Sequence, residues 1–261
     1  MGERKHTFVV CAYGRSPFLE ECVESLVDQT QESGLVIATS TPNDLIEGIS
    51  DKYGIPLFVR EGKPGIAPDW NYAVSCANSP FVTIAHQDDV YAPNYAERAV
   101  SALLSVKKPL IFFSDYGELR NGKRVGDAPL AKVKRKMMLP YRAKGLSSFK
   151  LVKRAPISLG NSICCPAVTY APGNLPSPLF REGFKSNLDW DAWERFSRLS
   201  GSFVYDSFVG MYHRVHDESE TSACIADDTR TKEDLAMLER FWPKFAAKRI
   251  NAIYSKAQNF N

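Results

Sequence analysis

The chain of 261 residues lacks the sequence signatures of several large classes of protein. It contains neither G-x-G-x-x-G nor G-x-x-x-x-G-K-S/T, which argues against dinucleotide oxidoreduction and P-loop phosphoryl transfer. Its six cysteines include no C-x-x-C pair, so we expect buried thiols in a reducing compartment and no zinc site. No apolar run reaches the roughly 18 residues that a membrane-spanning helix needs.

The excess of one charge over the other is also small. The 33 basic and 30 acidic residues leave a net charge of +3, which is too little to indicate a nucleic-acid-binding protein. The charged residues 1–6 lead directly into an apolar stretch and do not resemble a signal or transit peptide. We therefore expect the protein in the cytoplasm, and peripheral attachment to the inner face of the cell membrane stays open.

Acidic residues are missing from a long internal stretch. Between residues 128 and 180 there is no Asp or Glu, whereas nine basic residues occur, at Lys132, Lys134, Arg135, Lys136, Arg142, Lys144, Lys150, Lys153 and Arg154. A segment of one sign is typical of a solvated surface. It also fits a surface for anionic lipid headgroups, a flap over a phosphate-bearing ligand or a nucleic-acid contact, and we place nucleic acid last. Met137, Met138 and Leu139 favour an interfacial segment within 132–154 that meets an anionic membrane.

Apolar and amphipathic stretches alternate in the first half of the chain. Strands are predicted over 7–12, 35–39, 55–59 and 81–85, and helices are predicted to begin near Ser16-Pro17, at the capping-box-like stretch Thr41-Pro42-Asn43-Asp44 and at Asp69. This alternation predicts an α/β fold with a mostly parallel central sheet, in which the first, second and fourth strands end at one edge. Further along we expect a helix over 93–106, a strand over 110–114, a hairpin turn at Asn121-Gly122, a helix over 188–199, a strand over 202–212 and one helix over 232–257.

The stretch His86-Gln87-Asp88-Asp89 follows the buried strand 81–85. Two adjacent carboxylates at the carboxyl end of a parallel strand suit Mg²⁺ or Mn²⁺, which favour carboxylate oxygen and bridge to substrate phosphates. The alternative is structural, because Asp89 is also suited to cap a helix that begins near Pro93. Two neighbouring strands are predicted to end at the same edge, at Tyr13-Gly14-Arg15 and at Thr39-Ser40-Thr41. This grouping favours a ligand site over a helix cap.

Several motifs, taken in order, resemble those of the family-2 glycosyltransferases, which are inverting enzymes of the GT-A fold that use nucleotide sugars. The stretch from Phe8 to Leu26 is similar to the family's first strand, nucleotide loop and first helix, and His86-Gln87-Asp88-Asp89 lies where the family carries D-x-D. Leu188-Asp189-Trp190-Asp191-Ala192-Trp193 is similar to the helix start E-D-x-(D/E)-x-W, and Tyr212-His213-Arg214-Val215-His216 with Ser219 and Thr221 is similar to the closing segment. The resemblance implies a Rossmann-like GT-A domain with a smaller acceptor-side region. Its nucleotide-sugar-binding half would span 1–115, and its acceptor-binding, catalytic-base half 116–261, as one continuous domain.

The resemblance also implies a role for each matching residue. Asp189 would be the general base, with its pKa raised by the apolar surroundings of Trp190 and Trp193. Asp88, Asp89 and His216 would hold the divalent metal, Mn²⁺ or Mg²⁺, although Asp89 also suits a cap. The nucleotide sugar would contact Ala12, Tyr13, Arg15, Thr39, Asp44, Lys63, Asn71, His86, Gln87, Asp88, Arg214 and His216.

Two positions depart from the family pattern. His86 replaces the first aspartate of D-x-D, and Thr39-Ser40-Thr41 replaces an acidic pair, for which Asp44 is a substitute. The resemblance implies metal-dependent, inverting transfer of a sugar, with a UDP-sugar as the expected donor, to a glycan or lipid-linked acceptor in cell-surface polysaccharide synthesis. Two alternatives stay open: a nucleotidyltransferase on a related α/β fold, and a non-catalytic nucleotide-sugar or membrane-surface module.

Overall fold

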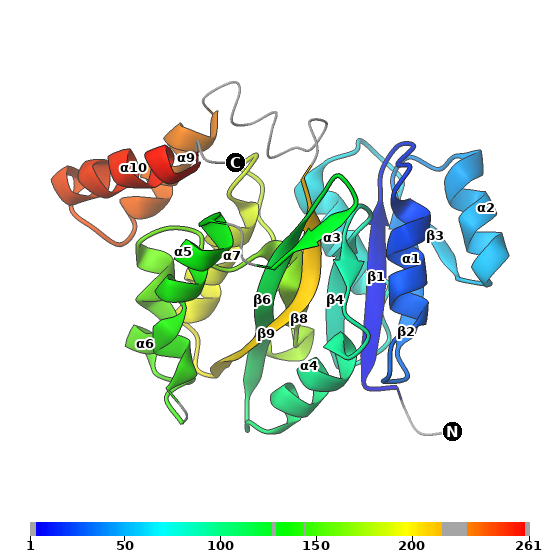
Figure 1. Ribbon diagram of the computed structural model, residues 1–261, viewed down its shortest axis with the longest axis horizontal. Coiled ribbons are helices and arrows are strands. Elements are labelled where there is room, and N and C mark those ends of the chain that lie inside the picture. Colours follow the sequence, from blue (N-terminus) through cyan, green and yellow to red (C-terminus); the bar gives the residue numbers. More distant parts are fainter. Residues whose placement is uncertain (1–3, 127–128, 144, 216–228, 259–261) are drawn as a thin grey trace.

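A computed structural model describes residues 4–126, 129–143, 145–215 and 229–258. Within them a nine-stranded sheet runs in the order β3-β2-β1-β4-β8-β6-β9-β5, with β7 beside β6, and helices flank the sheet (Figure 1). Three residues of the predicted closing motif, His216, Ser219 and Thr221, lie outside the described residues.

The first half of the chain forms the predicted parallel βα units. Strands β1 (His6–Ala12), β2 (Gly34–Thr39), β3 (Leu57–Val59) and β4 (Phe81–His86) are parallel, and they alternate with α1 (Leu19–Val27), α2 (Asp44–Tyr53) and α3 (Ile66–Ser75). Helix α2 begins at Asp44, within the predicted stretch 41–44, and its N-cap is Asn43, whose Oδ1 accepts hydrogen bonds from the backbone N–H groups of Leu45 and Ile46 at 3.1 and 3.2 Å. Helix α1 begins two residues later than predicted, at Leu19, and helix α3 begins three residues earlier, at Ile66.

The second half makes the sheet mixed. After β5 (Val90–Tyr91) and α4 (Tyr95–Leu104), the long strand β6 (Pro109–Arg120) turns at Asn121-Gly122 into β7 (Lys123–Val125), which confirms the predicted hairpin. Strand β9 (Ser202–Arg214) is parallel to β6, whereas β8 (Val168–Tyr170) lies antiparallel between β4 and β6. The predicted half-domain boundary at residue 115 falls inside β6, and that division stays a prediction.

The remaining elements are helical. They are α5 (Pro129–Met137), η1 (Leu139–Arg142), α6 (Lys150–Arg154), η2 (Pro156–Ser158), η3 (Cys165–Ala167), η4 (Pro172–Asn174), α7 (Leu188–Ser197), α9 (Thr229–Leu238) and α10 (Lys244–Gln258). The prediction of a single helix over 232–257 was wrong. Pro243 has no N–H to continue a helix, so the chain turns between α9 and α10. Trp242 and Phe245, whose spacing would place them on the apolar face of one continuous helix, are 38% and 70% exposed.

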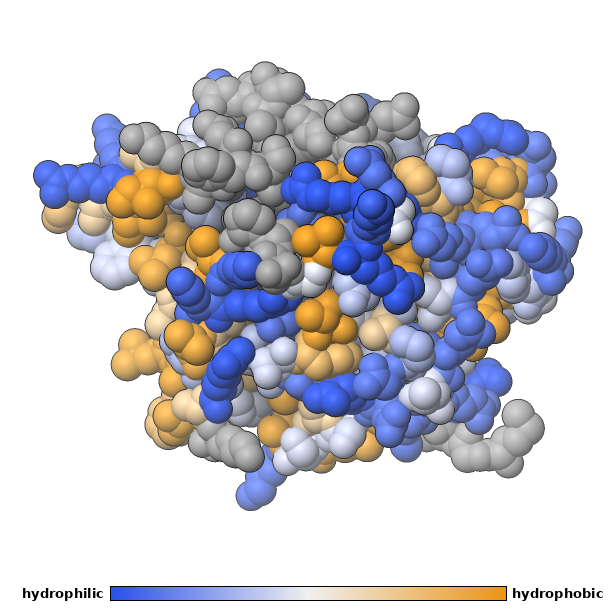
Figure 2. Space-filling view, in the orientation of Figure 1, coloured by the Kyte–Doolittle hydropathy of each residue, from blue (hydrophilic) through white to orange (hydrophobic). Residues whose placement is uncertain are grey.

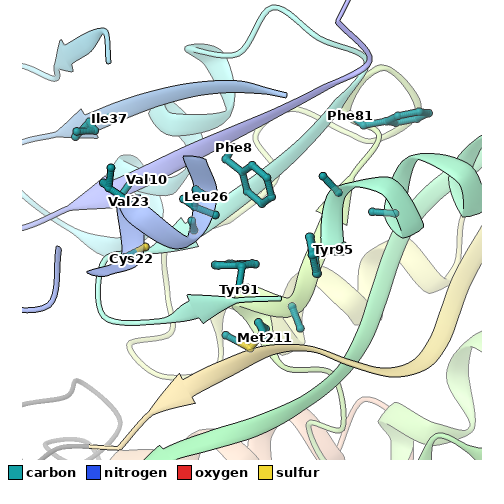
Figure 3. Packing of buried hydrophobic residues seen from close by; sticks show 14 of the residues in the cluster. Phe8, Val10, Cys22, Val23, Leu26, Ile37, Phe81, Tyr91, Tyr95 and Met211 are labelled. Atoms are coloured by element: carbon teal, nitrogen blue, oxygen red, sulfur yellow. The ribbon is translucent and has the colours of Figure 1, made fainter. Parts of the chain in front are cut away.

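An aromatic core fixes the position of the strand ends that carry the site. Phe8 on β1 packs edge-to-face on Tyr91 of β5, with ring centroids 5.5 Å apart, and Tyr91 packs edge-to-face on Tyr95 of α4 (Figure 3). Cys22 of α1 lies in the same cluster as a free buried thiol, as predicted from the cysteine pattern. Among the described residues, no helix is both long and apolar enough to span a bilayer.

Candidate functional site

The carboxyl ends of β1, β2 and β4 meet at one sheet edge, as the strand alternation predicted. Ala12 on β1 pairs in register with Thr39 on β2, and Cys11 pairs with His86 on β4. The Gln87 side chain joins two of these ends, because its amide donates to the carbonyl of Tyr13 and accepts the N–H of Tyr13, each at 2.9 Å. Gln87 therefore holds the backbone of the predicted nucleotide loop in place.

The residues predicted to bind the nucleotide surround this edge. Arg15 forms an exposed ion pair with Asp44, and the Thr39 hydroxyl accepts the N–H of Thr41 at 3.0 Å. Ala12 is buried at the end of β1, whereas Tyr13 and Lys63 are exposed. Their contacts with a nucleotide stay predictions.

Asn71 has a structural contact that the sequence did not predict. Its amide donates to the carbonyl of Phe180 at 2.8 Å and accepts the N–H of Phe180 at 3.0 Å. This pair joins α3 to the segment before α7. The predicted contact of Asn71 with the nucleotide would have to coexist with these two bonds.

An acidic side chain does lie at the end of β2, but it comes from α3. Asp69 accepts hydrogen bonds from Ser40 Oγ at 2.9 Å, from Arg60 Nε at 2.6 Å and from the N–H of Gly65 at 3.1 Å. Asp69 thus supplies a carboxylate beside the stretch Thr39-Ser40-Thr41, where the family's acidic pair is missing. No local sequence signal marks this contact, because Ser40 and Asp69 are 29 residues apart.

Asp89 is fully buried and joins the turn after β4 to β9. Its Oδ1 accepts hydrogen bonds from His213 Nδ1 at 3.0 Å and from the N–H of Arg214 at 2.9 Å. Burial acts to lower the pKa of His213, but the charge and hydrogen bond of the neighbouring Asp89 carboxylate outweigh it. The pKa of His213 is therefore raised to about 9. These contacts give Asp89 and His213 a structural role, and Asp89 as a metal ligand stays a prediction.

Arg214 completes the same junction. Its Nε donates to the carbonyl of Asp88 at 2.8 Å, its Nη2 pairs with Glu21 at 2.5 Å, and its guanidinium lies 4.2 Å from the ring centroid of Phe18. The side chain is nearly buried, so the structure fixes it next to the backbone of Asp88. That position suits a charge near a departing diphosphate, and this role stays a prediction.

His86, the residue that departs from the family pattern, is stacked on Trp70. The two ring centroids are 5.1 Å apart and the ring planes are inclined by 24°. Burial lowers the pKa of His86 although Asp88, Asp89 and Asp189 all act to raise it, so the ring is neutral near pH 7. The acidic pair and the predicted base therefore both act electrostatically on His86.

Asp189 stands at the start of α7, almost buried. Asn161 Nδ2 donates to Asp189 Oδ2 at 2.7 Å, and the N–H of Trp190 donates to Oδ1 at 2.7 Å. Burial raises the pKa of Asp189, while these hydrogen bonds and the charges of Lys134 and Arg230 act in the opposite direction. The direction agrees with the prediction of a base tuned by its apolar surroundings. Asn161 itself was not predicted, since it falls in an apolar stretch without a clear pattern.

No cluster of three or more His, Cys, Asp or Glu side chains suited to a metal occurs in the described part of the chain. Two polar atoms beside Asp88 are nevertheless buried without a hydrogen-bond partner: His86 Nε2 and Asp89 Oδ2. Mg²⁺ is commonly bound through one or two carboxylates, with water and substrate phosphates completing its shell. The residues present therefore fit a cation held by Asp88 together with the diphosphate of a bound substrate.

The basic segment 132–154 contains both side chains that are held within the fold and side chains that are exposed to solvent. Arg135 pairs with Asp115 at 3.2 Å, Arg154 pairs with Glu194 at 2.7 Å, and buried Lys153 donates to the carbonyls of Leu199 and Gly201. The Lys134 ammonium lies 5.3 Å from the ring centroid of Tyr116 and acts electrostatically on Asp189. These four basic residues thus serve the fold or the site.

A mostly parallel sheet with an acidic pair after β4 and a buried carboxylate at the start of α7 is the arrangement expected of a GT-A-type transferase. The chain belongs to glycosyl transferase family 2, whose profile matches residues 7–137. An uncharacterized glycosyltransferase of Rickettsia typhi is 24% identical over 246 residues, which cover 93% of this chain and 71% of the relative. A second, from Rickettsia prowazekii, is 22% identical over 245 residues, with the same two shares covered.

Solved glycosyltransferases share the fold. The structure of S. aureus TarS residues 1–349 in complex with UDP-GlcNAc superimposes with a TM-score of 0.64 at 16% identity, covering 97% of this chain and 72% of that one. The mannosyltransferase PcManGT from Pyrobaculum calidifontis, in complex with GDP-Man and Mn²⁺, gives 0.60 at 14% identity, covering 98% and 70%. The predicted GT-A fold and glycosyltransferase class are thereby confirmed, and the family match favours glycosyl transfer over the two alternatives.

Proposed function

We propose that this enzyme transfers a sugar from a nucleoside-diphosphate sugar, with a UDP-sugar as the expected donor, to a hydroxyl of a glycan or lipid-linked acceptor, with inversion at the anomeric carbon. The observation that carries the proposal is an acidic pair at the carboxyl end of β4 together with buried Asp189 at the start of α7, since Asp88 and Asp189 both act on the pKa of His86. Binding of UDP-GlcNAc by TarS and of GDP-Man by PcManGT supports a nucleotide-sugar donor.

The reaction is a single displacement at the anomeric carbon. Asp189 accepts the proton of the acceptor hydroxyl while that oxygen forms a bond to the anomeric carbon. The bond from this carbon to the diphosphate oxygen breaks at the same time, and its electron pair leaves with the nucleoside diphosphate. A divalent cation, when bound, neutralises charge on the leaving diphosphate. Asp88 would hold that cation, and Arg214 would add positive charge beside it.

The donor assay tests this proposal directly. The protein is incubated with Mn²⁺ and a panel of UDP-, GDP- and dTDP-sugars, and release of nucleoside diphosphate is followed with and without candidate acceptors. We expect release from one donor by the wild type and a loss of at least about 100-fold in Asp88→Asn and in Asp189→Asn. Asp28→Asn, which changes an exposed carboxylate at the carboxyl end of α1, is the matched control. Pyrophosphate release would instead favour a nucleotidyltransferase, and unchanged activity in Asp189→Asn would contradict the assignment of the base.

The second part of the proposal concerns an anionic membrane surface, which would suit a lipid-linked acceptor in cell-surface polysaccharide synthesis. Leu139, Phe149 and Leu151 are 54%, 58% and 82% exposed, and Lys136 and Lys150 lie exposed in the same segment. Figure 2 shows apolar side chains next to hydrophilic ones over α5 and α6. Since Arg135, Lys153 and Arg154 are engaged within the fold, the lipid-facing part of the segment 132–154 narrows to about 136–151.

Liposome sedimentation tests this partner. We expect vesicles with anionic lipid to retain the protein at low salt, and Lys136→Glu with Lys150→Glu to release it. Lys107→Glu with Lys108→Glu changes the net charge equally at other exposed lysines and should have little effect. Equal retention by neutral vesicles, or equal loss in both double variants, would contradict the proposed surface.

A further inference from the structure

Helix α10, far from the acidic pair in sequence, reaches the surroundings of Asp189. Tyr254 on this helix is only 8% exposed, and its ring lies beside Trp190 with centroids 6.1 Å apart. The ring also covers Gly160, where a Cβ atom would lie 2.5 Å from a ring carbon. Only glycine at position 160 allows this approach. Trp190 follows Asp189 directly, so the ring packs on the residue next to the base.

A hydrogen-bonded chain continues from Tyr254 to the base. The backbone N–H of Asn161 donates to the Tyr254 hydroxyl at 3.2 Å, and Asn161 Nδ2 donates to Asp189 Oδ2 at 2.7 Å. Asn161 is 6% exposed, so water does not substitute easily for either bond. The other Asp189 oxygen is held by the adjacent N–H of Trp190, a local contact of the helix start. Among the described residues, Asn161 therefore supplies a tertiary hydrogen bond that fixes the plane of the carboxylate.

We propose that Asn161 and Tyr254 are positioning residues for the catalytic base: Tyr254 fixes the backbone of residue 161, and the Asn161 amide orients the Asp189 carboxylate toward the acceptor. This inference rests on the proposed role of Asp189 and extends it. It gives the C-terminal helix α10, which lies beyond the segment 7–137 that the family profile matches, a part in the reaction.

Several other charged or titratable groups also act electrostatically on Asp189. The titratable or charged groups that face it are Lys134 from α5, Arg230 from α9, His86 at the end of β4, Cys164 and Cys165 at η3, and Tyr170 on β8. Burial raises the pKa of both cysteines and of Tyr170 and lowers that of His86, so these four are neutral between about pH 7 and 8. Arg230 also hydrogen-bonds Tyr254.

The two contacts differ in what their loss should change. The Asn161 amide donates to the ionised form of Asp189, so removing it disfavours ionisation and raises the pKa further. The base must be ionised to accept a proton, so the acidic limb of the kcat/KM profile moves to higher pH. Removing the Tyr254 hydroxyl leaves the Asn161 amide present but less well placed. This change should lower kcat more than it shifts the acidic limb of the kcat/KM profile.

The experiment measures pH profiles of nucleoside-diphosphate release for Asn161→Leu and Tyr254→Phe. We expect the acidic limb of Asn161→Leu to move up by roughly one pH unit, as for the loss of a hydrogen bond to a charged group. Tyr254→Phe should lower kcat by about five-fold, as for the loss of a neutral hydrogen bond, with a smaller limb shift in the same direction. KM for the donor should stay unchanged in both variants. Ile253→Ala, an exposed neighbour on α10, is the matched control.

Two results would overturn the inference. One is an acidic limb that superimposes on the wild type in both variants, and the other is a fall in activity that follows donor KM or thermal stability alone. If Asn161→Leu does not fold, Asn161→Ser and Tyr254→Phe carry the same test. A wild type without release, or an active Asp189→Asn, would instead count against the proposed function itself, so the two failures are distinguishable.

Discussion

The Oδ1 atom of fully buried Asp89 accepts a hydrogen bond from His213 Nδ1 at 3.0 Å, across 124 residues of sequence. The pair joins the turn after β4 to the last residues of β9, and it does so directly beside Asp88. The two adjacent carboxylates therefore have different surroundings. Asp89 is used inside the protein, while Asp88 is only partly buried at the sheet edge.

This difference predicts opposite phenotypes for the two aspartates. Asp89→Ala leaves the partly buried His213 ring and the N–H of Arg214 without their acceptor and should lower the free energy of unfolding by about 3 kcal/mol, which for a chain of this size is a fall of roughly 6–12 °C in Tm. Asp88→Asn should keep Tm close to the wild type and lose transfer activity. Thermal unfolding and nucleoside-diphosphate release, measured on both variants, check this difference. If Asp89→Ala keeps the native Tm but loses metal-dependent activity, Asp89 is a metal ligand and the structural role assigned to it is contradicted.

Removal of divalent metal should abolish activity without unfolding the protein. Chelation takes away the cation that Asp88 and the diphosphate would hold, so release of nucleoside diphosphate should stop and return on addition of Mn²⁺. The core is built from apolar and aromatic packing, so Tm should not change on chelation. Full turnover in the presence of chelator would show that the charges of Arg214 and its neighbours are sufficient.

The activity should fall on acidification at a higher pH than an ordinary aspartate would require. Burial raises the pKa of Asp189, and only its ionised form accepts the acceptor's proton. As pH falls through this raised pKa, kcat/KM should decrease about ten-fold per pH unit, since a single proton is taken up. The measurement is kcat/KM of the free enzyme between pH 4 and 8. A flat profile down to pH 4 would place the base elsewhere.

Lys153 separates the structural from the surface role of the basic segment. Its ammonium is buried and donates to the carbonyls of Leu199 and Gly201, just after α7. Lys153→Met leaves both carbonyls without this donor and should cost about 2 kcal/mol of stability. Binding to anionic liposomes should be unchanged, because this charge does not reach the surface. Loss of liposome binding at native Tm would contradict that assignment.

The sequence predicted the parts of the fold whose signals are local. Alternating apolar and amphipathic stretches indicated the four parallel strands. The stretch Thr41-Pro42-Asn43-Asp44 and the turn Asn121-Gly122 marked a helix start and a hairpin where the structure has them. Strand β8 was not predicted, because three residues between two sheet partners give too short a pattern to read. The prediction of a single helix over 232–257 was wrong because the apolar periodicity continues across Pro243, although the helix itself does not.

The site was predictable where motifs carry it and not where distant side chains meet. The edge formed by Tyr13, Thr39 and His86 follows from strand order, and Asp189 follows from its helix-start motif. Asp69 at the end of β2 and Asn161 at the base come from loops or helices with no motif of their own, and their contacts span 29 and 28 residues. Such contacts depend on tertiary packing, which a single sequence does not reveal.

The most direct test of the account is the anomeric configuration of the product, read by NMR immediately after transfer from an α-linked nucleotide sugar. A single displacement assisted by Asp189 predicts a β-linked product from the wild type and no product from Asp189→Asn. An α-linked product would contradict the account, because it requires two displacements or a different face of attack.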